Sequence, residues 1–281
     1  MMRTMTKNEG GGKYAICAIG RMENRYAHEW VGYHLALGFD HIYIYDNNRD
    51  GEERFEEVLQ DFINAGRVSI IDYRNKKHAQ IPAYNEFYLC YGKQYDWIAY
   101  FDFDEFLVLE QPLNDFLREF CHADCLLVNW RVMTDSGLVH YDGRPMRERF
   151  TVPLGDDVLM RGKHKYNDHV KSIVRGHLSE MAFQNQPHVP KGPKVYCTVN
   201  GNVVEPYPFQ SCNHAKARID HYLTKTLEEW LTVKYVRGYP CGITKQWREE
   251  MAIKQFFEIN ERTKEKEKML KEWMKKMGLM G

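Results

Sequence analysis

The spacing of four short β-rich runs constrains the fold of this chain more than any other feature. Runs with the composition of buried strands occupy residues 14–20, 41–46, 67–73 and 97–102. Their first residues, 14, 41, 67 and 97, are 27, 26 and 30 positions apart. A strand–helix–strand unit takes roughly 30 residues, so this spacing predicts consecutive parallel strands joined by helical crossovers.

The intervening segments carry the pattern of amphipathic helices. In the first two, apolar and aromatic side chains recur three and four positions apart, which places them on one helical face. Gly66 ends the second segment, and Pro82 opens the third, where a missing N–H costs nothing. The two faces consist of Trp30, Tyr33, His34 and Leu37, and of Phe55, Val58, Leu59, Phe62 and Ile63. We therefore predict an α/β fold with a mostly parallel sheet flanked by helices.

Composition excludes several classes of protein. Lys+Arg and Asp+Glu balance at 39 each, so no net basic charge points to nucleic acid as a partner. No apolar run approaches the ~18–20 residues of a transmembrane helix. The first run is not followed by the glycine pattern of dinucleotide-binding folds, and no P-loop motif occurs. Most of the seven cysteines lie in apolar runs, which is typical of reduced core thiols in a cytoplasmic protein.

Polar residues follow three of the predicted strands, at 20–24, 46–50 and 102–105. Ligands of parallel sheets bind at the carboxyl ends of the strands. Because side chains alternate along a strand, we expect Asp102 and Asp104 to project to the same side. Two carboxylates there suit Mn²⁺ or Mg²⁺, which fill their remaining positions with substrate phosphate and water. Acids at a strand end can instead face solvent, but the apolar runs on both sides favour the cation.

A series of motifs runs through most of the chain in one order. They are RMEN (21–24), EWVGYHLALGFDHIYIYDNNRDG (29–51), YFDFDEF (100–106), NWRVMTDSG (129–137), HVKSIVRG (169–176), PHVP (187–190) and IDHYLTKTLEEWLTVKYVRG (219–238). With them the chain resembles nucleotide-sugar glycosyltransferases of the GT-A fold, in particular the family 92 and family 2-like enzymes. The resemblance implies a GT-A type sheet, a less regular half on the acceptor side and a helical C-terminus. We expect a flexible leader over 1–12, a glycosyltransferase domain over 13–240 and a helical extension over 241–281.

The resemblance also implies roles for individual residues. Asp102 and Asp104 would ligate the Mn²⁺ or Mg²⁺ that bridges the donor diphosphate, and His221 would be a third ligand or a diphosphate contact. The implied donor-binding residues are Asp46 and Asn47 at the nucleoside, Gln80 and Asn85 in the nucleotide pocket, and Lys171 and Lys225 at the diphosphate. His164, His169, His188 and His214 have no spacing that predicts a metal site.

The acceptor side is less well defined by these motifs. The chain has WRVMTDSG at 130–137, where the family usually shows a glycine-containing W-x-x-F-G-x-x-G. Trp130 is the candidate for stacking on an acceptor sugar, and the alternative is a core aromatic. Asp135 is the candidate catalytic base, and the alternative is a turn residue in TDSG.

The second half of the chain is predicted to contain strands, a hairpin and helices. We expect strands in CLLVNWRVM and HVKSIVRG and a hairpin centred on Asn200-Gly201. Residues 261–281 carry seven Lys/Arg against four Glu, a local charge of +3. Their apolar residues Leu270, Trp273, Met274 and Met277 share one helical face. Such a helix can lie on an anionic membrane, here the inner face, or pack back on the domain or a second subunit.

These patterns favour a metal-dependent, inverting glycosyltransferase. It would move a sugar from a nucleotide-diphosphate donor, most simply a UDP-sugar, to a saccharide acceptor that is a glycan or lipid-linked, as in surface polysaccharide synthesis. One alternative is a phosphatase or phosphotransferase with an aspartyl nucleophile, although Phe106 stands where those enzymes have Thr or Val. Another is a carbohydrate-binding module that uses the acids for Ca²⁺, although Ca²⁺ prefers six to eight oxygens.

Overall fold

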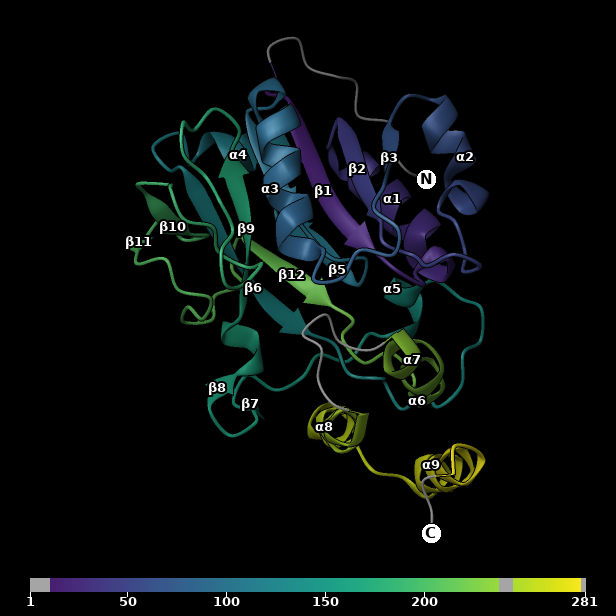
Figure 1. The fold of residues 1–281 in the computed structure, drawn as a ribbon. Coiled ribbons are helices and arrows are strands. Elements are labelled where there is room, and N and C mark those ends of the chain that lie inside the picture. Colours follow the sequence, from purple (N-terminus) through teal and green to yellow (C-terminus); the bar gives the residue numbers. More distant parts are fainter. Residues whose placement is uncertain (1–10, 238–244, 279–281) are drawn as a thin grey trace.

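A computed structural model of the chain describes residues 11–237 and 245–278, and it has the predicted α/β architecture (Figure 1). Residues 1–10 of the expected leader and the expected boundary at 240/241 lie outside these ranges. The strands are β1 (Tyr14–Gly20), β2 (His41–Asp46), β3 (Val68–Asp72), β4 (Trp97–Tyr100), β5 (Glu105–Leu109), β6 (Cys125–Val132), β7 (Leu159–Met160), β8 (His164–Lys165), β9 (Val170–Arg175), β10 (Tyr196–Thr198), β11 (Val203–Val204) and β12 (Ala217–His221).

Helices alternate with the first strands and gather again at the C-terminus. The helices are α1 (Asn24–Leu37), α2 (Glu56–Asn64), α3 (Gln80–Tyr91), α4 (Leu113–Arg118), α5 (Met146–Arg149), α6 (Leu227–Glu229), α7 (Tyr235–Arg237), α8 (Lys245–Ile259) and α9 (Lys264–Lys276). Short 3₁₀ turns cover Gly92–Gln94 and Tyr166–Asp168, and a π-helical turn covers Trp230–Lys234.

The central sheet has the order β11-β10-β6-β9-β4-β1-β2-β3. β3, β2, β1 and β4 are parallel, as the regular spacing predicted, and β9 runs antiparallel between β4 and β6. The last residues of β6 also pair with β12, which in turn pairs antiparallel with β5. The predicted hairpin is confirmed, since β10 and β11 pair antiparallel around Asn200-Gly201. This order fits the GT-A type of fold that the motifs implied.

Helices cover both faces of the sheet and bury the predicted apolar stripes. On one face, Trp30 of α1 and Leu59 of α2 are fully buried in the larger core cluster. On the other, Tyr84 and Phe87 of α3 are fully buried in a second cluster. His34 also lies on the buried face of α1 with no exposed surface. The 3.6-residue periodicity of the sequence therefore identified the faces that hold the sheet.

The fourth strand is shorter than the sequence predicted. β4 ends at Tyr100, and Asp102 and Asp104 lie in the turn that leads into β5. Hydrogen bonds close this turn, because Glu105 N–H donates to the carbonyl of Asp102 and Asp102 N–H donates to the Glu105 carboxylate. Since the backbone leaves the extended conformation, strand alternation does not apply, and the two aspartates contact different elements of the fold.

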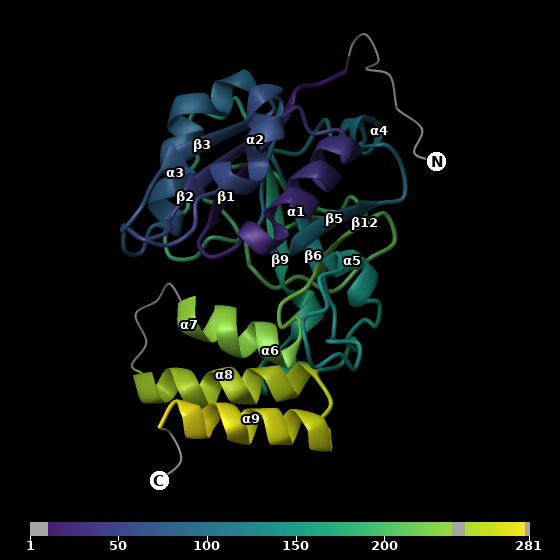
Figure 2. The ribbon, with the colours of Figure 1, turned by 90° about the vertical axis from the view of Figure 1, so that its right-hand side faces the viewer.

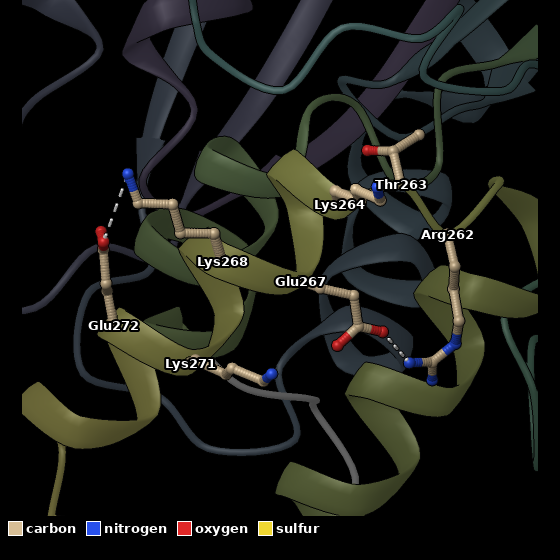
Figure 3. Close-up of a pocket in the computed structure, with 7 residues that line it drawn as sticks. All are labelled: Arg262, Thr263, Lys264, Glu267, Lys268, Lys271 and Glu272. Atoms are coloured by element: carbon tan, nitrogen blue, oxygen red, sulfur yellow. Dashed lines mark hydrogen bonds and ion pairs between the residues drawn. The ribbon is translucent and has the colours of Figure 1, made fainter.

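The C-terminal helices pack on one another beside the sheet (Figure 2). Leu270 of α9 is buried in a third cluster, and Trp273 meets Tyr235 of α7 edge-on with ring centroids 4.7 Å apart. Most of the apolar face of α9 therefore packs against the protein, whereas Met277, just past the end of the helix, is 41% exposed. The outer side of α9 borders a hollow with charged walls, in which Arg262 pairs with Glu267 (Figure 3). Within the described ranges, no helix is long and apolar enough to cross a membrane.

Candidate active site

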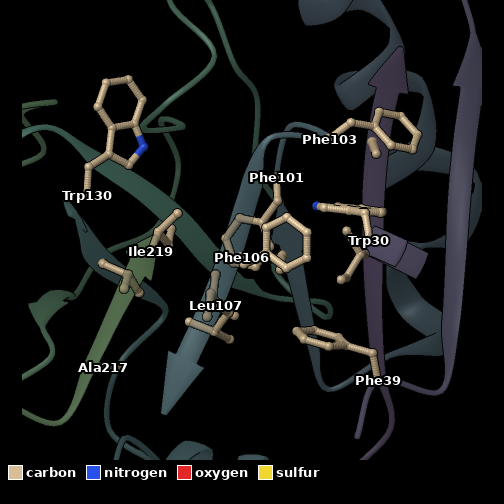
Figure 4. Close-up of a cluster of buried hydrophobic side chains, with 14 of the residues drawn as sticks. Trp30, Phe39, Phe101, Phe103, Phe106, Leu107, Trp130, Ala217 and Ile219 are labelled. Atoms are coloured by element: carbon tan, nitrogen blue, oxygen red, sulfur yellow. The ribbon is translucent and has the colours of Figure 1, made fainter. Parts of the chain in front are cut away.

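Aromatic side chains on both sides of the acids anchor the turn after β4 in the core, among them Phe101, Phe103 and Phe106 (Figure 4). Phe101 is fully buried and Phe103 is 1% exposed. The Trp30 indole donates a hydrogen bond to the carbonyl of Glu105 at 2.7 Å. Gly20 ends β1 beneath the turn, where a Cβ would lie 2.6 Å from the Phe103 ring. The apolar residues that flank the acids thus anchor the turn at the carboxyl end of β4.

Asp102 is held by side chains from two elements. Its Oδ1 accepts a hydrogen bond from the Gln80 amide of α3 at 3.0 Å, and its Oδ2 accepts one from Lys171 Nζ of β9 at 2.8 Å. One third of the Asp102 side chain is exposed, whereas Lys171 is fully buried. Gln80 and Lys171 therefore orient a carboxylate that solvent and a ligand can reach.

Asp104 lies deeper, among cationic groups. Lys225 Nζ is 3.3 Å and Lys234 Nζ 3.0 Å from its Oδ2, and His221 Nε2 is 3.5 Å from its Oδ1. Burial alone would raise the pKa of Asp104, but Lys234, Lys225 and His221 outweigh burial and hold the pKa well below its usual range. The carboxylate is therefore charged at neutral pH.

Glu105 is the third acid of the turn and is fully buried. Lys171 Nζ is 3.2 Å from its Oε2, so a single lysine serves both Asp102 and Glu105. Burial raises the pKa of Glu105 to about 8, against the opposing effect of Lys171. The site thus combines the charged Asp104 with a carboxyl at Glu105 that favours its protonated form.

Trp130 lies at the end of β6 within a group of histidines. Its ring stacks on His169 with centroids 4.1 Å apart, and the His221 ring lies 4.2 Å away. His188 completes the group at 4.3 Å from His169. Burial lowers the pKa of His169 to about 3 and holds that of His188 well below its usual range. These imidazoles are therefore neutral, and Trp130 itself is only 7% exposed and belongs to the larger core cluster.

Comparison with known proteins identifies the family. The model of glycosyltransferase family 92 matches residues 16–277. The chain belongs to glycosyltransferase family 92. A family 92 protein of Ricinus communis is 30% identical over 247 residues, which cover 81% of this chain and 41% of that protein. A galactan β-1,4-galactosyltransferase of Arabidopsis thaliana is 31% identical over 105 residues, which cover 34% of this chain and 21% of that protein. This family 92 chain thus spans less than half the length of these curated relatives.

Among solved structures, the family 92 chain is similar to S. aureus TarS. TarS residues 1–349 in complex with UDP-GlcNAc superimpose with a TM-score of 0.43 and 11% sequence identity, over 88% of this chain and 72% of that one. The same protein in complex with UDP gives a TM-score of 0.43 and 14% identity.

The remaining donor-site candidates of this family 92 chain have partners within the protein. Asp46, at the end of β2, accepts hydrogen bonds from Asn48 and forms an ion pair with Arg74 at 2.8 Å. Asn47 donates to the carbonyl groups of Tyr73 and Lys76. Both residues share the carboxyl edge with Asp102, because β2, β1 and β4 are parallel neighbours.

Asn85 and Asp135 lie outside the group of contacts around Asp104. Asn85 exchanges two hydrogen bonds with the backbone of Phe183 and so anchors the segment after β9 to α3. Asp135 is 2% exposed and pairs with Lys266 of α9 at 2.5 Å. It also accepts a hydrogen bond from Gly137 N–H, which is the turn geometry of TDSG. Its role as base remains a prediction, and the observed contacts are structural.

Sequence reasoning assigned no site role to four residues of this group, namely Glu105, His169, His188 and Lys234. Lys234 lies within the last of the quoted motifs, but only the folded chain brings it to Asp104. His169 and His188 sit in two further motifs, and their proximity to Trp130 depends on the pairing of β6 with β9. All four residues lie within the quoted motifs, so the motifs could have identified them as site candidates. Their spacing along the sequence could not.

Proposed function

We propose that this chain transfers a glycosyl group from a nucleotide-diphosphate sugar to a saccharide acceptor. The observation that carries the proposal is the turn with Asp102 and Asp104 at the carboxyl edge of the parallel sheet, surrounded by three lysines, in a chain of glycosyltransferase family 92. The diphosphate is the leaving group of this reaction, and positive charge near its oxygens stabilises it as it departs. The lysines at this edge of the sheet supply that charge.

The residues present suit a divalent cation beside Asp104. The distance of 3.5 Å from Asp104 Oδ1 to His221 Nε2 is long for a hydrogen bond, and a movement of about 0.5 Å would bring the two atoms to the ~3.0 Å between neighbouring ligands of an octahedral ion. Burial lowers the pKa of His221, so a lone pair is available, and its Nδ1 is buried without a hydrogen-bond partner among the described residues. Asp104 and His221 would therefore hold Mn²⁺ or Mg²⁺, with donor oxygens and water completing its coordination.

Asp102 would act next to this pair. Among the described residues, Asp102, Asp104 and His221 do not bring three ligand atoms within 4.8 Å of one another. Lys171 and Gln80 hold Asp102 in place, and its exposed third faces the edge where the donor would enter. We therefore infer that Asp102 completes the cation site through a bound water or after a small rotation of its side chain.

The reaction breaks the bond between the sugar and the diphosphate. When bound, the cation would stabilise the negative charge of the leaving diphosphate as a Lewis acid. Lys225 and Lys234 add two fixed charges on the same side, each as a point charge without directional preference. Asp46 and Asn47 at the end of β2 would position the nucleoside, and Gln80 and Asn85 would line the pocket from α3.

The finer features of the reaction are proposals as well. We take a UDP-sugar as the donor, a glycan or lipid-linked saccharide as the acceptor, and inversion at the anomeric carbon as the outcome, all from the family resemblance. Trp130 would then contact the acceptor only through the 7% of its surface that is exposed. The buried thiols of Cys17, Cys125 and Cys197 support a reducing compartment such as the cytoplasm. Contact with a membrane would use the basic outer side of α9, since most of its apolar face is packed.

Thermal unfolding with UDP, with MnCl₂ and with both tests the proposal directly. Mn²⁺ and UDP together should stabilise the protein by ~2.7 kcal/mol at 100-fold excess over the dissociation constant, and by far less singly. Asp104→Asn should abolish this gain. Asp50→Asn, which removes an exposed acid at the same edge of the sheet, should preserve it. Equal UDP binding by Asp104→Asn, or phosphate release from simple phosphoesters, would overturn the proposal.

Release of UDP from a panel of UDP-sugars then identifies the donor. The matching sugar should give faster UDP release than the others, with the same dependence on Asp104. The anomeric configuration of the product, read by NMR, decides between inversion and retention.

A further inference from the structure

Side chains from two loops form a second potential metal site, separate from Asp104. Asp156 lies in the loop between α5 and β7, and Cys212 and His214 lie in the loop that precedes β12. Each contributes one ligand atom, and these three atoms lie within 4.8 Å of one another. From this geometry we propose that Asp156, Cys212 and His214 bind a transition-metal ion of the Zn²⁺ class. Sequence spacing did not predict a metal site at His214. Its partners Cys212 and Asp156 are 2 and 58 residues away (214 − 212 and 214 − 156), which matches no metal-binding motif.

The ligand types match this class of ion. Zn²⁺ binds thiolate sulfur at ~2.3 Å, imidazole nitrogen at ~2.0–2.1 Å and carboxylate oxygen at ~2.0–2.2 Å, usually in a tetrahedron. Tetrahedral bond angles place the sulfur and nitrogen ligands roughly 3.6 Å apart at those bond lengths. In this structure Cys212 Sγ lies 3.9 Å from His214 Nδ1 and 3.3 Å from its Nε2, so a small turn of the imidazole toward the sulfur would complete the geometry. Mg²⁺ and Ca²⁺ prefer an all-oxygen set and do not fit a thiolate.

His214 is oriented as metal-binding histidines usually are. Its Nε2 lies 2.8 Å from the carbonyl oxygen of Trp130. A carbonyl only accepts hydrogen bonds, so Nε2 carries the proton, and the lone pair of Nδ1 is left for an ion. A backbone carbonyl that fixes the second nitrogen of a ligating imidazole is a recurring feature of metal sites.

The other two residues also have fixed partners, Asp156 at its carboxylate and Cys212 at its backbone. The Asn167 amide donates to Asp156 Oδ1 at 2.7 Å, which fixes the carboxylate and leaves Oδ2 for coordination. The backbone N–H of Cys212 donates to Asp168 Oδ1 at 3.2 Å. Because Asn167 and Asp168 belong to one 3₁₀ turn, a single short element positions both ligands.

The site would connect two loops that border the acceptor half of the fold. Leu154 N–H donates to the carbonyl of Val132 in β6, and His214 contacts the carbonyl of Trp130 in the same strand. A shared ion would therefore tie both loops to the end of β6, close to Trp130. Asp156 is exposed and the fourth position is left to solvent, so the ion can exchange.

Cobalt spectroscopy tests this proposal independently of glycosyl transfer. Full-length protein freed of metal by a chelator is titrated with Co²⁺ and then competed with Zn²⁺. We expect one equivalent of Co²⁺ with a thiolate-to-cobalt charge-transfer band in the near ultraviolet, which Zn²⁺ removes. Within residues 11–237 and 245–278, no thiol contacts the aspartate site after β4, so that site is not expected to produce this band.

Matched variants decide the assignment. Cys212→Ser should remove the band and weaken Zn²⁺ binding by more than the about 10- to 100-fold that loss of an outer partner costs. Cys121→Ser, which removes an exposed thiol elsewhere, should retain both. Should Cys212→Ser fail to fold by circular dichroism, the exposed Asp156→Asn replaces it and should weaken Zn²⁺ binding at least tenfold. Binding without a thiolate band, or unchanged affinity in the folded variant, would overturn the proposal.

Discussion

Acidification should destabilise this protein through His34, a fully buried histidine beneath the acidic turn. His34 Nδ1 donates to the carbonyl of Trp30 at 2.9 Å, and its Nε2 accepts from Leu107 N–H at 3.3 Å. Both ring nitrogens thus have hydrogen-bond partners in the neutral form. Protonation of Nε2 would place its N–H against the backbone N–H of Leu107 and break that hydrogen bond. Burial lowers the pKa of His34 to about 3.

The sign and the size of the effect follow from linkage. Between pH 6.5, the ordinary pKa of histidine, and the folded value of about 3, the unfolded chain binds a proton that the folded chain does not. The free energy of unfolding therefore falls as the pH falls through this window. One pKa unit corresponds to ~1.4 kcal/mol, so His34 alone costs about 2 kcal/mol between pH 6.5 and 5. Such a loss is a large part of the ~5–15 kcal/mol of a typical domain.

Urea unfolding near pH 7, 6 and 5 measures this slope. His34→Met removes the titrating group and should flatten the slope by about 0.7 kcal/mol between pH 7 and 6 and by about 1.2 kcal/mol between pH 6 and 5, although its stability near pH 7 will be lower. His28→Gln removes an exposed histidine of the same helix and should leave the slope unchanged. If His34→Met and the parent chain lose stability in parallel, the imidazole is not held neutral and the reasoning is wrong.

Two further predictions concern buried ion pairs. Lys171→Met leaves the Asp102 carboxylate without its buried cation and should cost about 3 kcal/mol in urea unfolding, the lower end for a buried pair because a third of Asp102 is exposed. Lys171→Met/Asp102→Asn should recover part of this, and an additive loss would contradict the pair. Asp135→Asn should lower stability through loss of the pair with Lys266 while leaving the rate of UDP release within tenfold. A fall of ~10²–10⁴ in that rate, with UDP binding intact, would instead assign the catalytic base to Asp135.

The sheet could be predicted from the sequence because its pattern is local. β1 and β2 have the predicted limits, and β3 and β4 differ from them only at their ends. The apolar stripes that cover the sheet follow the helical period, which burial against one surface imposes. β4 is shorter than predicted because the acids of YFDFDEF close a turn through Glu105. The alternation of side chains along a strand does not predict such a turn.

The site could be predicted only in part, because its contacts are long-range. Asp102 and Asp104 stand out locally as acids between apolar runs. Their partners are 69 residues away at Lys171 and 130 away at Lys234, and no periodicity connects such positions. Family motifs supplied Lys171, Lys225 and His221, whereas Lys234 required the structure.

The balance of charge at this edge also bears on how a donor would be received. Asp104 has two lysines on one oxygen and His221 on the other, so its negative charge is already neutralised within the protein. Lys225 and Lys234 can pair fully with a diphosphate only if their ion pairs with Asp104 weaken. A cation at Asp104 and His221 would allow this, because it replaces the lysines as the partner of the carboxylate. The joint requirement for nucleotide and Mn²⁺ in the unfolding experiment therefore follows from the lysines as much as from the aspartates.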